Sequence, residues 1–116
     1  MEKPTEILIE DRDGIALLNI HGDLTAYSEP YLIEAYRQVE EEASDSDLIF
    51  VFSNEAYINS GGIAALIQIL AQIRKTNRTV GIAGISDHFV KIFNMVGISK
   101  LAHIFGSLDE ALATMG

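Results

Sequence analysis

The first part of the chain contains two short apolar runs, 7–9 and 15–18, separated by a polar stretch that ends in Asp-Gly. Residues 6–21 read as two strands around a tight turn, because Asp13 and Gly14 favour the positive backbone angles of a two-residue hairpin. The second strand has apolar residues on both faces, namely Ile15 and Leu17 on one and Ala16, Leu18 and Ile20 on the other. We therefore expect this strand to be buried on both sides.

Residues 29–42 change to helical spacing, and residues 47–52 return to a strand pattern. Ser28 is expected to cap the helix, with Pro30 in its first turn. The apolar positions that recur along this helix are Leu32, Ala35, Tyr36 and Val39. The run DLIFVF at 47–52 is apolar almost without interruption, which is typical of a strand covered on both faces in a parallel sheet.

Helix and strand alternate through the remainder of the chain. The helix that begins near residue 60 carries an apolar stripe: Ile63, Leu66, Ile67, Leu70 and Ile73. Strands are expected at 79–85 and 103–105, and each is followed by a serine that can cap a helix, Ser86 and Ser107. Gly97 is expected to end the first of these two helices, whose apolar side is predicted to be core: Phe89, Ile92, Phe93, Met95 and Val96.

The order of these elements indicates an α/β fold. A hairpin followed by alternating strands and helices implies right-handed crossovers and a largely parallel sheet. We expect a mixed, mostly parallel sheet of about four to five strands with about four helices. Residues 1–116 show no internal repeat, low-complexity tract or linker, so they are predicted to form a single domain.

Composition narrows the classes of function. Apolar residues make up 48% of the chain, and cysteine is absent, which excludes disulfides, thiolate metal sites and cysteine nucleophiles. The 17 acidic residues against 8 basic ones give a net charge of −9, which repels phosphate backbones, so direct nucleic-acid binding is not expected. No window reaches the roughly 18 apolar residues of a membrane helix, and the first residues do not resemble a signal peptide. We expect a soluble, cytoplasmic protein without membrane insertion.

The most unusual stretch is YINSGG at 57–62, where a strand pattern gives way to a helix. Asn59 can cap that helix, which places Ser60 at its first position, at the positive end of the helix dipole. Gly61 and Gly62 cost the helix about 1 kcal/mol each relative to alanine. Either tight packing requires small residues here, or a partner must approach closely. The Gly-Lys-Ser/Thr of a P-loop and the G-x-S-x-G elbow of hydrolases are both absent.

The chain resembles the STAS domain family, in particular the bacterial anti-sigma factor antagonists. The most specific similarity is the turn around Ser60, where the family typically reads Asp-Ser-Ser/Thr-Gly-Leu/Ile. The resemblance covers nearly the whole chain and rests on five segments: DGIALLNIHGDLTAYSEPYL, LIFVF, YINSGG, VGIAGI and FNMVGISKLAHIFGSLDEAL.

The resemblance implies a binding protein without catalytic activity or cofactor. Such proteins bind an anti-sigma factor that has serine kinase activity. The kinase phosphorylates the first serine of the turn, here Ser60, which breaks the complex, and a serine phosphatase restores it. The residues predicted to contact the partner come from two turns: Thr25, Ala26, Tyr27, Asn59, Gly61, Gly62 and Ala65.

Three positions depart from the family pattern. Asn59 and Thr25 stand where the family commonly has acidic residues, and Gly61 replaces the second serine or threonine. The departures make the site less acidic, which eases repulsion of a phosphate but removes contacts that a kinase could recognise. The alternative function is therefore a non-phosphorylated structural STAS subunit of a transporter or a stress-sensing complex.

Two further hypotheses concern individual side chains. The three histidines lack the spacing of metal ligands, so no metal site is predicted. His21 and Ser60 both lie near strand ends, and a Ser–His hydrolase is the third alternative, although it would need an orienting acid and an oxyanion site. Tyr27 and Tyr31 lie on either side of the predicted start of the first helix. They either form an exposed aromatic contact for a partner or pack within the protein.

Overall fold

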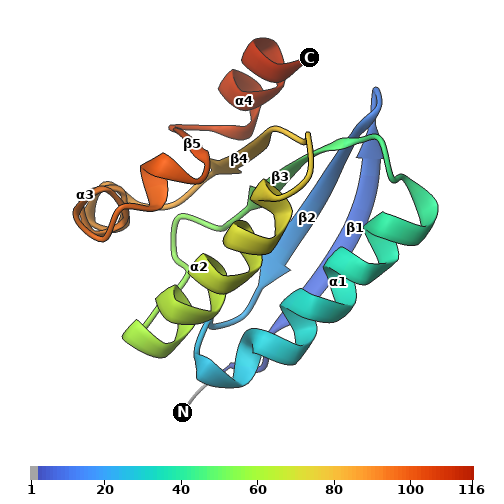
Figure 1. Ribbon diagram of the computed structural model, residues 1–116. Coiled ribbons are helices and arrows are strands. Elements are labelled where there is room, and N and C mark those ends of the chain that lie inside the picture. Colours follow the sequence, from blue (N-terminus) through green and yellow to red (C-terminus); the bar gives the residue numbers. More distant parts are fainter. Residues whose placement is uncertain (1–2) are drawn as a thin grey trace.

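A computed structural model describes residues 3–116 and arranges them as one sheet with helices on both faces (Figure 1). The strands are β1 (Glu6–Arg12), β2 (Ile15–His21), β3 (Asp47–Val51), β4 (Val80–Ala83) and β5 (His103–Phe105). The helices are α1 (Glu29–Glu42), α2 (Ser60–Arg74), α3 (Asp87–Met95) and α4 (Leu108–Met115). Two short 3₁₀ turns, η1 (Ala26–Ser28) and η2 (Ile98–Lys100), precede α1 and β5.

The five strands lie in the sheet in the order in which they follow one another along the chain. β1 and β2 are antiparallel, and β2 to β5 are parallel to each other. Asp13 (φ 54°) and Gly14 (φ 86°) form the turn between β1 and β2 with positive backbone angles at both positions. The predicted hairpin, the mixed sheet and the α/β class are therefore confirmed.

The helices are distributed unequally over the two faces of the sheet. Each parallel crossover is right-handed and moves to the next strand in the same direction, so α1, α2 and α3 cover the same face. The core on that face includes Leu18, Phe50 and Ile82. On the opposite face α4 covers a smaller cluster that includes Leu17 and Ile49. Burial of both faces of β2, as predicted, follows from this arrangement.

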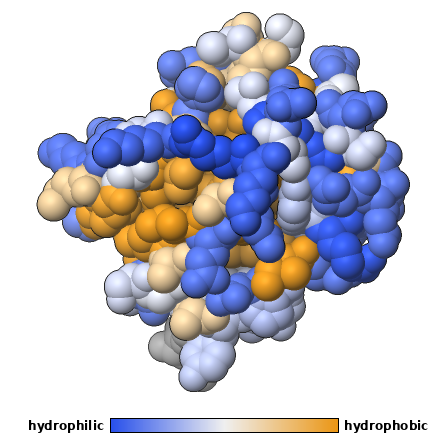
Figure 2. All heavy atoms as spheres, viewed as in Figure 1, coloured by the Kyte–Doolittle hydropathy of each residue, from blue (hydrophilic) through white to orange (hydrophobic). Residues whose placement is uncertain are grey.

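The apolar surface of α2 and α3 differs from the prediction. Ile63 and Ile67 are only partly buried, because α2 directs Ala65 and Ile69 inward. In α3, Phe93 is fully buried, but Met95 is 84% exposed and Val96, directly after the helix, is 47% exposed, so the prediction that these two residues belong to the core is wrong. Met95 follows Phe93 by two positions, which is about 200° around a helix, so its side chain points away from the sheet. Figure 2 shows the resulting apolar side chains at the surface of the face that carries α1, α2 and α3.

Ser28 precedes α1 as predicted, but it does not cap the helix. Its side chain is completely buried, and its hydroxyl accepts a hydrogen bond from the backbone N–H of Thr25 at 2.8 Å. Ser28 therefore closes the turn between β2 and α1 instead of stabilising the first amides of the helix.

Candidate functional site

The turn after β2 and the turn after β3 lie side by side at the carboxyl edge of the parallel strands. Leu24 and Ile58 form an isolated parallel bridge between them. The backbone N–H of Leu24 donates to the carbonyl of Tyr57 at 2.9 Å, and that of Asn59 donates to the carbonyl of Leu24 at 3.1 Å. The structure thus brings together the two segments whose residues were predicted to contact a partner.

Asn59 caps α2 as predicted. Its backbone is extended (φ −102°, ψ 179°), and its side-chain oxygen accepts a hydrogen bond from the N–H of Gly62 at 2.9 Å. Its carbonyl accepts the first helical hydrogen bond, from Ile63 at 2.9 Å. Asn59 therefore makes the N-cap hydrogen bond that an aspartate would make, but without the negative charge. The stretch 57–62 contains no carboxylate at all.

Ser60 is the first residue of α2 and is exposed. Within residues 3–116 its hydroxyl makes no hydrogen bond, so neither its oxygen nor its proton is committed to the fold. The amides of the first helical turn and the positive end of the dipole lie next to it. A negative group placed on Ser60 is thus favoured by the N-terminus of α2.

The two glycines after Ser60 are required by packing inside the protein. A Cβ on Gly62 would lie 2.1 Å from the carbonyl oxygen of Leu24, and a Cβ on Gly61 would lie 2.9 Å from the Cβ of Ala26. The first turn of α2 therefore rests directly on the chain between residues 24 and 26. This observation favours the packing explanation, and the interpretation that both glycines make room for a partner's backbone is wrong for Gly62, which is buried.

Two exposed tyrosines lie on the two turns that meet beside the start of α2. Tyr27 in η1 is 80% exposed, and Tyr57 in the loop after β3 is 56% exposed. Tyr57 was not among the residues singled out from the sequence. The signal that could have found it is its place directly before the buried Ile58, since successive side chains of an extended segment point to opposite sides.

The other predicted contact residues divide into exposed and buried groups. Ala26 is exposed, and Asn59 and Gly61 are half-buried. Thr25 is buried at 2% exposure, where its hydroxyl caps η1 by accepting a hydrogen bond from the N–H of Tyr27 at 3.2 Å. Thr25 therefore stabilises the turn between β2 and α1.

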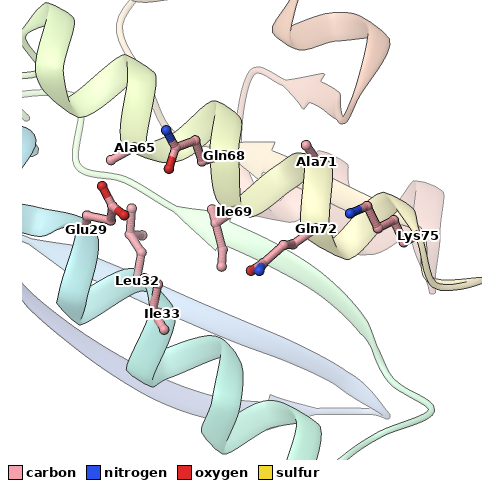
Figure 3. Close-up of a pocket in the computed structure, with 9 residues that line it drawn as sticks. All are labelled: Glu29, Leu32, Ile33, Ala65, Gln68, Ile69, Ala71, Gln72 and Lys75. Atoms are coloured by element: carbon pink, nitrogen blue, oxygen red, sulfur yellow. The ribbon is translucent and has the colours of Figure 1, made fainter.

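Ala65 does not point away from the core, as its predicted role requires. It is 4% exposed and lines a groove of 340 Å³ between α1 and α2. Figure 3 shows Leu32, Ile33 and Ile69 directed into the space between the two helices, with Gln68 and Gln72 along the α2 side. A larger side chain at position 65 would enter this groove.

Other chemistry at the site is limited. His21 lies at the end of β2 opposite Glu6, and no hydrogen bond within residues 3–116 joins its ring to Ser60. In the same residues no group of three His, Cys, Asp or Glu side chains could hold a metal ion. None of the described helices is long and apolar enough to cross a membrane. The features that remain are an accessible serine and two exposed aromatic rings.

Comparison with known proteins relates this fold to one family. The sequence model of the STAS domain family matches residues 6–111 of this chain. An anti-sigma-B factor antagonist from Staphylococcus aureus is 23% identical over 93 residues, which cover 80% of this chain and 85% of the relative. One from Staphylococcus epidermidis is 23% identical over 92 residues, covering 79% and 84%. The crystal structure of an anti-sigma factor antagonist from Mycobacterium paratuberculosis superposes with a TM-score of 0.77 at 20% identity, covering 96% of this chain and 93% of that one.

Proposed function

We propose that this chain, which belongs to the STAS domain family, is an anti-sigma factor antagonist switched by phosphorylation of Ser60. Its partner is an anti-sigma factor with serine kinase activity, in the cytoplasm of a bacterium, and a serine phosphatase reverses the modification. The observation that carries the proposal is the exposed hydroxyl of Ser60 at the N-terminus of α2, which makes no hydrogen bond with any residue of 3–116. The names of the relatives support the same role.

The surroundings of Ser60 suit a switch that changes binding and leaves the fold intact. A phosphate adds about −1.5 to −2 charges. At the N-terminus of α2 it would stabilise the helix by about 0.3–1 kcal/mol. Buried in an interface without a counter-charge, the same group costs several kcal/mol, and each ~1.4 kcal/mol weakens binding tenfold.

The direct contact surface consists of the exposed residues around Ser60. Tyr27 and Tyr57 present large exposed rings from the two turns that meet here, and tyrosines that become buried on binding are frequent hot spots of protein interfaces. Ala26, Asn59 and Gly61 complete this surface. Thr25, Gly62 and Ala65 are buried and act through the shape they give to it.

One observation favours the alternative of a non-phosphorylated STAS subunit. The stretch 57–62 carries no carboxylate, and neutral Asn59 and Thr25 perform the capping by themselves. A kinase that recognises acidic groups beside its target serine would find none in this turn. In that case the same exposed surface binds a permanent partner.

Phosphorylation of the purified chain separates the two functions. The chain and its Ser60→Ala variant are incubated with ATP and the kinase-type anti-sigma factor encoded in the same genome, and the modified residue is located by mass spectrometry. Switching predicts one phosphate on Ser60 and none on the variant. An unmodified chain that still binds the anti-sigma factor would favour the permanent subunit.

A further inference from the structure

The segment before β1 is attached to the turn that supports the candidate site. The hydroxyl of Thr5 lies 2.6 Å from the carbonyl oxygen of Asp23 and 2.6 Å from the hydroxyl of Ser28. The N–H of Asp23 donates to the carbonyl of Lys3 at 3.0 Å. At Gly22 (φ 82°) a Cβ would lie 1.9 Å from the carbonyl oxygen of Pro4, so the backbone of Gly22 packs directly against the backbone of Pro4.

The polar groups of this contact form a chain in which every hydroxyl both donates and accepts. The N–H of Thr25 donates to Ser28, and the hydroxyl of Thr5 donates to the carbonyl of Asp23. Because Thr5 has a single proton, the hydroxyl of Ser28 is then the donor in the 2.6 Å hydrogen bond between Ser28 and Thr5. Ser28 is fully buried and Thr25 is 2% exposed. Without Thr5, the buried hydroxyl of Ser28 still accepts from the N–H of Thr25, but the acceptor left for its own proton is the carbonyl of Asp23 at the longer distance of 3.3 Å.

The opposite side of the same turn carries the first turn of α2. The two hydrogen bonds of Leu24, to Tyr57 and from Asn59, join the turn to the loop that ends in Ser60. Ala26 is the nearest neighbour of a Cβ placed on Gly61, at 2.9 Å. Residues 24–28 therefore form a layer between the segment before β1 and the start of α2. A shift of this layer must move the surface around Ser60.

We propose that Thr5 is a positioning residue: acting through Ser28, it holds residues 24–27 against the start of α2 and so sets the surface on which Ser60 and Tyr27 are presented. The inference rests on the proposed function, because it concerns how the kinase-binding surface is kept in shape. Thr5 itself lies on the far side of this turn from α2 and makes no contact with the partner.

The first test compares matched threonine variants. Thr5→Val keeps the side-chain shape and removes the hydroxyl, and Thr5→Ser restores it. Thr76→Val is the control, because the hydroxyl of Thr76 also donates to a carbonyl at 2.6 Å, but Thr76 is an exposed residue beyond the opposite end of α2. Amide hydrogen exchange is measured at Leu24 and Asn59, whose N–H groups bridge the two turns.

We expect exchange at these two amides to become about tenfold faster or more in Thr5→Val, as local opening becomes easier. Thr5→Ser and Thr76→Val should keep the wild-type rates there. Wild-type rates in Thr5→Val, or the same acceleration in Thr76→Val, would overturn the inference. If Thr5→Val does not fold, Ser28→Ala removes the same contact from the other side and must show the acceleration instead.

The second test uses a kinase-type anti-sigma factor that phosphorylates the wild-type chain on Ser60. The KM of this kinase for Thr5→Val should rise about tenfold while kcat stays within about twofold, because the docking surface changes and the acceptor hydroxyl does not. Thr76→Val should match wild type, and equal KM values for all variants would overturn the positioning role. If the kinase does not phosphorylate Ser60 of the wild-type chain, the result counts against the proposed function alone. The hydrogen-exchange rates still test the positioning role of Thr5.

Discussion

Replacing Gly62 by alanine tests the close packing that places Ser60. Gly62 lies in the first turn of α2, and a Cβ there would be 2.1 Å from the carbonyl oxygen of Leu24 and 2.9 Å from the backbone nitrogen of Thr25. Both neighbours are backbone atoms, so no flexible side chain can move aside. The turn after β2 must shift away from α2 to accommodate the methyl group.

The size of the effect follows from three opposing contributions. Alanine improves helix propensity by about 1 kcal/mol. Overpacking costs about 1–3 kcal/mol, and the shift weakens the two hydrogen bonds of Leu24, to Tyr57 and from Asn59, which contribute about 0.5–1.5 kcal/mol each. The net loss for Gly62→Ala is therefore about 1–5 kcal/mol. On helix propensity alone the same change would stabilise the protein.

Urea denaturation of wild type, Gly62→Ala and the control Ala64→Gly gives the free energies of unfolding. Ala64 is an exposed residue two positions further along the same helix, so Ala64→Gly measures propensity without the packing term. We expect Ala64→Gly to lose about 1 kcal/mol. A Gly62→Ala protein as stable as wild type, or more stable, would refute the packing argument. It would favour instead the explanation that a glycine is needed for the approach of a partner.

The remaining predictions concern the surface and one titrating side chain. Tyr27→Ala and Tyr57→Ala should each weaken anti-sigma factor binding about tenfold or more in a titration, with unfolding free energies within about 0.5 kcal/mol of wild type. Ala65→Arg should lose about 1–3 kcal/mol of stability in denaturation, because its side chain enters the groove, whereas Ala64→Arg, at an exposed position of the same helix, should leave stability unchanged. Burial raises the pKa of Tyr36 from 10.0 to about 12, aided by its hydrogen bond to a neighbouring glutamate. Its contribution to stability is therefore complete below pH ~10 and is lost as the pH rises towards ~12, and Tyr36→Phe should reduce this loss in melts across that range.

Local sequence patterns were sufficient for the elements and their order. The hairpin follows from Asp13 and Gly14, which adopt positive backbone angles as that turn requires. The caps of the later helices follow from serine side chains that accept backbone N–H groups within three residues, at Ser86 and Ser107. Asn59 belongs to the same class. Each of these features depends on residues adjacent in sequence.

The errors concern contacts between distant segments. Ser28 looks like a helix cap in sequence, but Thr5, twenty-three residues earlier, takes part in its hydrogen bonding. Gly62 is small because Leu24 lies against it. Ala65 was assigned to a partner surface because nothing in the sequence shows that α1 packs beside it. The local pattern therefore indicates two turns that the structure does bring together, but it misjudges which of their residues are accessible.

The most direct test of the central claim is the affinity of Ser60 variants for the kinase-type anti-sigma factor. Binding isotherms and thermal melts are recorded for wild type, Ser60→Asp and Ser60→Ala. Ser60→Asp should melt at the wild-type temperature or slightly above it, because its charge lies at the N-terminus of α2, and should bind about tenfold more weakly or worse. Ser60→Ala should bind like wild type. Equal affinities for all three folded proteins would contradict a switch at Ser60.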